Sequence, residues 1–439
     1  MRKSPFLWRI WLTVVSLSPV IRRAFMQDSS VLTGYEQITY TIGIVSGLIS
    51  YTMLALTFVL AGRFRRIENL FGGLDKMYIV HAIVGSGAFV LMLMHPIFLV
   101  LKYIPVQISL AAAYLLPGAH RSINFGIAGF LTIILLMILT LYIKKIKYHH
   151  RKNSHTFFSI AFLFVAVHVF LIKSSLATIY FPWYYTYATI IALLGIGTYL
   201  WTIRGRRSNK HKVFEYQISA VKSHGTATEL ALTPVDKKIA YTAGQFAFLR
   251  FESEQISSEP HPFSFASSSK SRETVRVIMK HGGDFTDTLP RLHIGDRVRL
   301  EGPYGKFTLD TRSGLKNIRI AGGIGITPFM AMADELVATP GSHTAVDLYY
   351  LVRTPDDLIG LPYFQEIADT YPSFRVVPRV STTQWRLDLK QIEKMSWNLN
   401  KCDYYLCGPT GMKDSFITLL REKWVPQRHL HSEWYSFKI

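Results

Sequence analysis

Long apolar segments in the first half of this 439-residue chain constrain its fold more than any other feature. A helix rises about 1.5 Å per residue, so about 20 apolar residues cross a hydrocarbon layer about 30 Å thick. We predict six transmembrane helices, at residues 6–21, 38–61, 77–101, 125–143, 156–173 and 183–203. The first is short and contains Arg9, which suits a helix lying partly in the membrane interface.

Four histidines are associated with the third and fifth of these segments: His81 and His95 lie in the third, His168 lies in the fifth, and His155 directly precedes the fifth. The spacings of fourteen and thirteen residues correspond to about 20 Å along a helix. Ionisable side chains at such depth are costly and usually serve a function inside the helix bundle. The two segments run in the same direction, so His81 and His155 form an inner pair and His95 and His168 an outer pair. We infer that each pair ligates one haem iron, with one imidazole from each helix.

The spacing in the fifth segment is less regular than in the third. Fourteen residues return to within about 40° of the same helix face, whereas thirteen leave His155 and His168 about 140° apart. The haem hypothesis therefore requires a local distortion there, or haems approached from different sides. The alternative is that these histidines form hydrogen bonds between helices. We interpret His120, in the loop 102–124, as a solvated residue.

The formal net charge of +20 follows the membrane segments rather than forming a surface for nucleic acid. Basic residues cluster behind alternate spans, at Arg63, Arg65 and Arg66, at Lys144, Lys145, Lys147, Arg151 and Lys152, and at Arg204, Arg206, Arg207, Lys210 and Lys212. This asymmetry is typical of cytoplasmic loops. We expect a multi-pass protein of the cell (inner) membrane with both termini in the cytoplasm, in contact with the lipid bilayer.

The second half has the pattern of a soluble module. Period-two alternation predicts strands at 213–221, 227–233, 239–251 and 273–280, which suggests a small barrel. Strands at 317–321, 345–352, 374–380 and 402–406 alternate with helical segments and predict a parallel, doubly wound sheet. The predicted domains are therefore 1–207, 208–313 and 314–439.

A glycine-rich turn, Gly322-Gly323-Ile324-Gly325-Ile326-Thr327-Pro328, follows the first strand of that sheet. Glycines let the backbone approach a pyrophosphate closely, and a helix N-terminus offers free N–H groups. We expect Thr327 to cap the helix and Pro328 to lie in its first turn. The alternative is a turn that serves packing alone.

Further motifs occur in a definite order: His261-Pro262-Phe263-Ser264, Gly283-Asp284-Phe285-Thr286, Gly302-Pro303-Tyr304-Gly305, the glycine turn and Cys407-Gly408-Pro409. In this order they resemble the flavin and nicotinamide motifs of the ferredoxin–NADP reductase superfamily. Together with the paired histidines, the chain resembles the NADPH oxidase and ferric reductase family and is similar to compact bacterial NADPH oxidases. The resemblance implies a six-helix di-haem bundle, a β-barrel FAD domain and an α/β NADPH domain.

The resemblance also implies roles for individual residues. Ser264 would approach the flavin N5 edge, with Pro262 and Phe263 beside the ring and His261 at the ribityl or pyrophosphate region. Gly283 and Thr286 would bind the flavin diphosphate. The nicotinamide dinucleotide would be bound by Gly322, Gly323, Gly325, Thr327, Gly408 and Pro409.

Three side chains would govern hydride transfer and nucleotide choice. Arg353 would pair with the 2′-phosphate and favour NADPH, with NADH as an alternative donor; otherwise it is a surface arginine. Cys407 would lie near the nicotinamide C4, and otherwise acts as a buried small hydrophobe. An aromatic near the C-terminus, Tyr435 or Phe437, would cover the flavin, and otherwise packs in the core.

The implied activity is electron transfer from cytoplasmic NADPH through FAD and two b-type haems to dioxygen outside, with superoxide as the product. Three alternatives stay open: reduction of ferric or cupric ions, delivery of electrons to a periplasmic protein, and a transporter or channel with a regulatory nucleotide domain. We expect no obligatory cytosolic activator, because the chain shows no EF-hand loop and no Pro-x-x-Pro tract.

Overall fold

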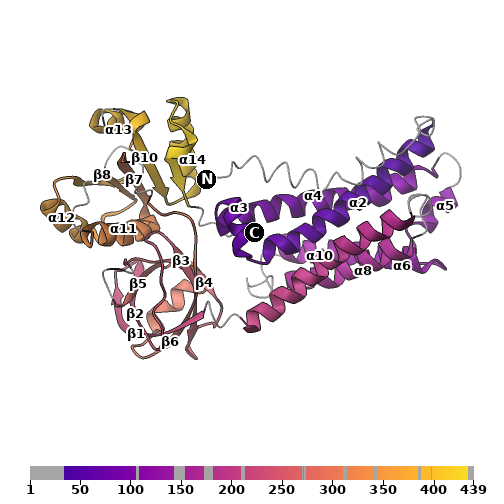
Figure 1. The fold of residues 1–439 in the computed structure, drawn as a ribbon, viewed down its shortest axis with the longest axis horizontal. Helices are drawn as coiled ribbons and strands as arrows, with labels where there is room; N and C mark the ends of the chain where they lie inside the picture. The colour runs from indigo at the N-terminus through magenta and orange to yellow at the C-terminus, as the bar shows by residue number, and fades with distance from the viewer. Residues whose placement is uncertain are drawn as a thin grey trace. The chain divides into compact units, whose positions relative to one another are not determined.

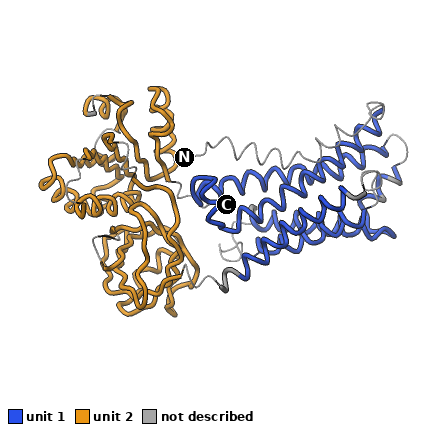
Figure 2. The backbone as a smooth tube through the Cα atoms, in the orientation of Figure 1, with its two compact units in different colours: residues 1–208, 439 blue, residues 209–438 orange. Residues whose placement is uncertain are grey.

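The computed structural model describes residues 34–104, 108–142, 154–172, 181–208, 213–268, 270, 273–309, 314–339, 344–383, 387–396 and 398–433. The chain forms two compact units, Met1–Ser208 with Ile439 and Asn209–Lys438 (Figure 2). The first unit is helical, and the second contains two β-sheets.

Unit 1 has five helices that are long and apolar enough to cross a membrane, counted over the described residues (Figure 1). They are α2 (Tyr35–Ala61), α4 (Leu74–Leu101), α6 (Arg121–Met137) with the π-helix η2 (Ile138–Tyr142), α8 (Phe158–Leu171) and α10 (Phe181–Ser208). Short helices α3 (Arg65–Phe71) and α5 (Ile108–Ala113) lie between them in the chain. The structure thus shows five spans rather than the six predicted, since the predicted span 6–21 lies outside the described residues.

Small residues and hydroxyl groups hold these helices together. Ser50 of α2 donates to the carbonyl of Ala88 at 2.8 Å, and Tyr51 donates to the carbonyl of Ala188 in α10 at 3.1 Å. Tyr184 of α10 donates to the carbonyl of Val169 in α8 at 2.8 Å. Such bonds satisfy side-chain polar groups inside a bundle that has no water to hydrate them.

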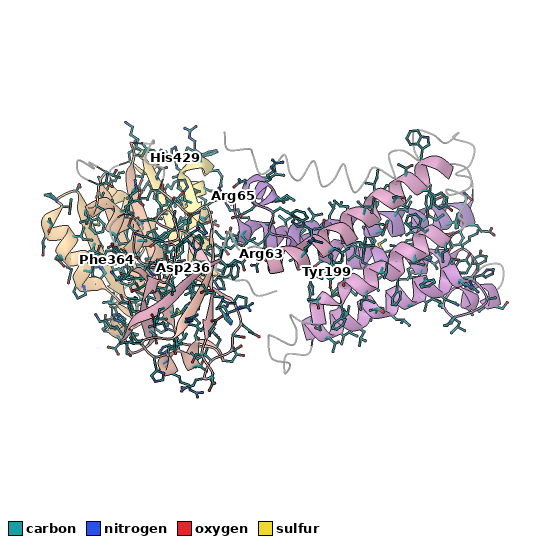
Figure 3. The ribbon with its side chains drawn as sticks, turned by 60° about the horizontal axis from the view of Figure 1, so that its bottom comes forward. Arg63, Arg65, Tyr199, Asp236, Phe364 and His429 are labelled. Atoms are coloured by element: carbon teal, nitrogen blue, oxygen red, sulfur yellow. The ribbon has the colours of Figure 1, made fainter. Side chains whose placement is uncertain are left out.

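Many of the exposed side chains on the long helices of unit 1 are apolar. Ile83, Leu193 and Trp201 are more than half exposed, which suits contact with lipid chains. Arg63 and Arg65 lie at the turn between α2 and α4 (Figure 3). There the Arg63 Nε donates to the hydroxyl of Tyr78 at 2.9 Å.

The first part of unit 2 is a six-stranded antiparallel sheet. Its strands are β1 (Val213–Ser223), β2 (Ala227–Pro234), β3 (Phe246–Glu252), β4 (His261–Ser264), β5 (Val275–Lys280) and β6 (Arg297–Tyr304), in the order β4-β3-β6-β1-β2-β5. A bridge between Phe265 and Val277 joins the two edges, so the sheet is nearly closed. The short 3₁₀ helix η3 (Thr286–Arg291) follows β5 in the chain.

One strand prediction is wrong in its extent. Residues 239–245 form an irregular segment, and the strand predicted at 239–251 begins only at Phe246. Ile239, Tyr241 and Ala243 are buried alternately, which produced the strand-like pattern. Gly244 adopts φ of +93°, a conformation that breaks a regular strand.

The second part of unit 2 is a five-stranded parallel sheet in the order β11-β10-β7-β8-β9. The strands are β7 (Lys316–Gly322), β8 (Val346–Val352), β9 (Phe374–Val380), β10 (Cys402–Cys407) and β11 (Leu430–Ser432), of which β11 was not predicted. Helices α11 (Thr327–Val337) and α12 (Leu361–Thr370) pack in one core, where Phe364 of α12 is fully buried (Figure 3). Helices α13 (Leu389–Ser396) and α14 (Thr410–Glu422) pack in the other.

Arg319 is an unusual residue for the middle of β7. Its side chain is 1% exposed, and it stands in register with Tyr405 of β10. Its three guanidinium nitrogens find no hydrogen-bond partner within the described part of the chain. Burial lowers the pKa of this guanidinium to about 10.

Candidate functional site

Unit 1 brings the four intramembrane histidines together in the predicted pairs. The ring centroids of His81 and His155 are 6.0 Å apart, with ring planes at 59°. Those of His95 and His168 are 6.2 Å apart, with planes at 73°. At each of the two levels, one histidine of α4 thus faces one histidine of the α8 segment.

Backbone carbonyls orient three of these imidazoles. The Nδ1 atoms of His81, His95 and His168 lie 3.0, 2.7 and 2.7 Å from the carbonyl oxygens of Thr57, Gly43 and Ser122. A carbonyl can only accept, so each Nδ1 carries the hydrogen and each Nε2 keeps a free lone pair. This is the usual arrangement of a metal-ligating histidine, whose second nitrogen donates to a carbonyl or carboxylate.

The segment between His155 and His168 is distorted at Phe157. The Phe157 N–H donates to the carbonyl of Ser154 at 3.0 Å, and the Ile160 N–H donates to the carbonyl of Phe157 at 2.9 Å. These bonds to the third preceding residue form a tighter turn before α8 begins at Phe158. A local distortion, the first of the two options, is therefore present between the two histidines.

The geometry of each pair fits a haem. With a metal–nitrogen bond of about 2 Å and a ring centroid about 1 Å behind the nitrogen, two opposed imidazoles have centroids about 6 Å apart. Among the described residues there is no cluster of three or more His, Cys, Asp or Glu side chains suited to a bare metal ion. Two imidazoles suffice only if the metal brings further ligands of its own, as a porphyrin iron does.

The two expected flavin motifs meet in unit 2. The His261 ring stacks on the Phe285 ring with centroids 3.7 Å apart and planes at 18°. Phe285 lies in the Gly283–Thr286 motif, but the sequence assigned it no role. Ser264 is buried at the end of β4 and pairs with Phe246 of β3, while Pro262 and Phe263 are half-buried.

The loop that carries Gly283 is held by its own hydrogen bonds. Thr286 donates from Oγ1 to the carbonyl of Gly283 at 3.3 Å, and the Asp287 N–H donates to the same carbonyl at 2.9 Å. The Gly282 N–H donates to Asp287 Oδ1 at 2.8 Å. The loop is therefore a fixed, partly exposed segment next to the His261–Phe285 stack.

The glycine turn lies where the order of the parallel sheet reverses. Strands β7 and β10 are neighbours, and their carboxyl ends pair at Ala321 and Cys407. Ligands of open α/β sheets bind at such a switch point. Gly323 has φ of +53°. A Cβ on Gly325 would overlap the Cys407 carbonyl oxygen and lie 2.6 Å from its carbonyl carbon. The turn therefore packs closely against the end of β10, where Gly408 and Pro409 follow.

The predicted cap of the following helix is wrong. Thr327 is already helical, with φ of −54° and ψ of −51°, and the N-cap is Ile326. The Thr327 hydroxyl donates to the carbonyl of Ile324 at 2.7 Å, so it does not accept a hydrogen bond from a free N–H of the helix. The 3₁₀ turn η4 (Gly323–Ile326) displaces the cap by one residue, and Pro328 lies in the first turn as predicted.

The remaining predicted nucleotide residues lie at or beyond strand ends. Arg353 follows β8 and is exposed, and Thr382 donates from N and Oγ1 to its carbonyl at 3.3 and 3.0 Å. Cys407 is the last residue of β10 and is fully buried. The Cys407 thiol could contact a nicotinamide only if the residues that bury it moved.

The chain is anchored just before its C-terminal aromatics. The buried Lys413 of α14 donates from Nζ to the carbonyl of Glu433, and the Glu433 N–H donates to the carbonyl of Leu406 at 3.4 Å. Tyr435 and Phe437 lie outside the described residues. The anchoring role of Lys413 was missed from sequence, because a lysine in a helix usually marks a solvated face.

An ion pair joins the two sheets of unit 2. Lys280 of β5 donates to Asp357 Oδ1 at 2.7 Å, and Thr226 donates to the same oxygen at 3.3 Å. The hydrogen bond from Lys280 holds the pKa of the Asp357 carboxyl below its ordinary value. Asp357 follows β8, so this contact ties the barrel to the parallel sheet.

Three family models match consecutive parts of the chain. Residues 46–166 match the ferric reductase-like transmembrane component, residues 217–309 the oxidoreductase FAD-binding domain, and residues 320–416 the oxidoreductase NAD-binding domain. Fold and matches thus define a multi-pass membrane protein of the flavin oxidoreductase class, with one FAD-binding and one NAD-binding domain. The chain belongs to the family of ferric reductases and NADPH oxidases.

Individual relatives match smaller parts of the chain. The reductase component of propane 2-monooxygenase from Mycolicibacterium smegmatis is 29% identical over 213 residues, 45% of this chain and 60% of that protein. The plasma membrane-associated coenzyme Q6 reductase of Saccharomyces cerevisiae is 30% identical over 139 residues, 30% of this chain and 45% of that protein. The chain therefore spans less than two thirds of these relatives' length.

Among solved structures, the cytochrome P450 reductase GcoB of Amycolatopsis shares 24% identity with a TM-score of 0.45, over 51% of this chain and 69% of that one. A ferredoxin reductase in carbazole 1,9a-dioxygenase shares 24% identity with a TM-score of 0.43 over the same shares of each chain.

Proposed function

We propose that this chain oxidises NADPH in the cytoplasm and passes the electrons through FAD and two b-type haems to dioxygen on the outer face. The balanced reaction is NADPH + 2 O₂ → NADP⁺ + H⁺ + 2 O₂•⁻. The observation that carries the proposal is the pair of facing imidazoles at two levels of unit 1, with centroids 6.0 and 6.2 Å apart.

The outer histidines determine how an acceptor could be reduced at the outer face. Bound haem supplies one-electron chemistry, while the protein provides ligation and orientation. His95 and His168 would hold the outer haem with one imidazole each, which would leave no coordination position on its iron for dioxygen. Electron transfer to dioxygen would then be outer-sphere, one electron at a time, and would favour superoxide as the product. The Nδ1 hydrogen bonds to Gly43 and Ser122 fix the ring orientations.

In unit 2, the residues bind and orient the flavin and the nucleotide. The His261–Phe285 stack presents a flat surface beside Ser264, which suits a flavin ring and its ribityl chain. The glycine turn offers close backbone approach to a pyrophosphate. Arg353 lies beyond β8, where a cation pairs with a 2′-phosphate and favours NADPH over NADH.

Orientation in the membrane follows from charge. Arg63, Arg65 and Arg66 lie in the connection between α2 and α4, where Arg65 and Arg66 begin the short helix α3, and such clusters mark cytoplasmic loops. Both termini would then be cytoplasmic, and the His95–His168 level would face outward. We expect the purified chain to work without a cytosolic activator.

A second candidate function is reduction of ferric or cupric ions by the same relay. It is favoured by the match of residues 46–166 to a ferric reductase-like component. The electron path inside the protein would be identical, and only the acceptor at the outer face would differ.

The deciding experiment uses the purified full chain in detergent with added FAD and NADPH. We expect two haems per chain and oxygen consumption with superoxide detected by a dismutase-sensitive probe. A ferric chelate is added as competitor. Preferential reduction of the chelate with little superoxide would select the metalloreductase, and a preparation without a haem Soret band would refute the relay.

Substitution of one ligand tests the site itself. His168→Ala should lower the haem content from two to one per chain and stop acceptor reduction. His120→Ala is the matched control, because His120 is an exposed loop residue and should keep both haems. Full haem content in His168→Ala would contradict the assignment.

A further inference from the structure

The two outer imidazoles each rest against a glycine of a neighbouring helix. A Cβ on Gly47 of α2 would lie 2.5 Å from His95 Nδ1 and 2.9 Å from its Cε1. A Cβ on Gly126 of α6 would lie 2.8 Å from His168 Nδ1 and 3.0 Å from its Cε1. Real Cβ contacts are essentially never closer than 3.0 Å, so any side chain at either position would displace the ring.

The same arrangement occurs in both helix pairs. The carbonyl that accepts from His95 belongs to Gly43, four residues before Gly47. The carbonyl that accepts from His168 belongs to Ser122, four residues before Gly126. Residues four apart lie on one helix face. Each helix therefore presents a carbonyl to Nδ1 and, one turn later, a bare backbone surface to the ring.

The inner level is built differently. The carbonyl that accepts from His81 belongs to Thr57, and the residue four positions later is Ala61. The glycine next to Thr57 is Gly85 of α4, whose Cβ would meet Thr57 Cγ2 at 3.8 Å, an ordinary contact. Among the glycines of the described helices, those that lie against an imidazole, Gly47 and Gly126, belong to the outer pair.

We propose that Gly47 and Gly126 are positioning residues for the outer haem, an inference that rests on the proposed haem ligation. Their bare backbones let His95 and His168 reach the carbonyls at 2.7 Å and hold the ring planes at 73°. A methyl group at either position pushes the ring away and lengthens the Nδ1 hydrogen bond. Loss of such support around a metal ligand typically lowers metal affinity about 10- to 100-fold.

The test compares Gly47→Ala and Gly126→Ala with two matched controls, Gly85→Ala and Gly197→Ala. No atom of the described residues lies within 4 Å of a Cβ at Gly197. Alanine favours a helix over glycine, so the controls should keep two haems and at least wild-type stability. The two test variants should lose outer haem, so that haem per chain falls from two towards one. The remaining haem should still be reduced by NADPH.

A second readout separates positioning from general misfolding. The low-spin haem signal in electron paramagnetic resonance depends on the mutual orientation of the axial imidazoles. Any outer haem retained by Gly47→Ala or Gly126→Ala should show a shifted signal and midpoint potential, while FAD content stays at the wild-type level. If Gly47→Ala cannot be purified, Gly126→Ala tests the other helix pair independently.

The outcomes are distinct from those for the proposed function. If the wild type binds two haems and both test variants keep two with unchanged signals and potentials, the positioning role is overturned and the relay stands. If the wild type binds no haem, the proposed function itself has failed. Equal haem loss in the Gly85 or Gly197 controls would also overturn the inference.

Discussion

Replacing Gly325 with alanine tests the glycine turn at its closest approach to β10. A Cβ there would overlap the Cys407 carbonyl oxygen and lie 2.6 Å from its carbonyl carbon and 2.8 Å from the Gly408 nitrogen. Carbon atoms pack best about 3.5–4.0 Å apart. These are main-chain atoms at a strand end, which cannot rotate away as a side chain would, so the turn and the strand must separate by about 1 Å.

The expected magnitude follows from the cost of overpacking. Inserting a methyl group into such a contact costs about 1–3 kcal/mol. The same backbone forms the proposed binding site for the pyrophosphate, so we expect this cost to weaken nucleotide binding. The KM for NADPH should therefore rise about 5- to 150-fold, with FAD and haem content unchanged.

The assay is NADPH-driven reduction of a soluble one-electron acceptor by the purified full chain, with KM and kcat read separately. Gly411→Ala is the control, because a Cβ at Gly411 meets no atom of the described residues within 4 Å. Its KM should stay within about twofold of wild type. An unchanged KM in Gly325→Ala would place the nucleotide elsewhere, and an equal rise in both variants would refute the steric argument.

Four further predictions concern unit 2 and the tail. Arg353→Ala should reduce the preference for NADPH over NADH by about tenfold or more; an unchanged ratio of KM values moves the 2′-phosphate role elsewhere. Lys280→Ala removes the hydrogen bond that depresses the pKa of Asp357. That bond stabilises the fold above the ordinary carboxyl pKa of about 4 and loses its effect as pH falls through the lower folded value. The Tm difference from wild type should therefore shrink at acid pH, and a pH-independent difference would argue against this ion pair. Arg319→Met should raise Tm, because a buried cation with no hydrogen-bond partner among the described residues is replaced by an apolar side chain; a lower Tm would reveal a partner. Tyr435→Ser should produce a long-wavelength charge-transfer band as nicotinamide stacks on the uncovered flavin. No band, and unchanged FAD reduction, would count against gating by this residue.

Local patterns in the sequence were enough to predict most of the helices and strands. The apolar segments that form α2, α4, α6, α8 and α10 were predicted because hydropathy summed over about 20 residues depends on composition alone. The glycine turn after β7 was predicted for a similar reason, since its motif is contiguous. The first predicted span stays a prediction, and so do the roles of Tyr435 and Phe437.

Irregular segments and unusual residues were not predictable in this way. Residues 239–245 alternate like a strand but bend at Gly244, and β11 is only three residues long. The pairing of His261 with Phe285 joins two motifs that are separate in the chain. The periodicity of apolar residues indicates which side chains are buried, but it does not indicate which residues they pack against.

The histidine pairs show most clearly how the two sources differ. Sequence alone placed His81 with His155 and His95 with His168, because depth in a membrane follows from residue number along a helix. Only the tertiary structure revealed the turn at Phe157 and the glycines behind the outer rings. Gly47 and His95 lie 48 residues apart and Gly126 and His168 lie 42 apart, and contacts over such separations depend on how helices pack rather than on any local pattern.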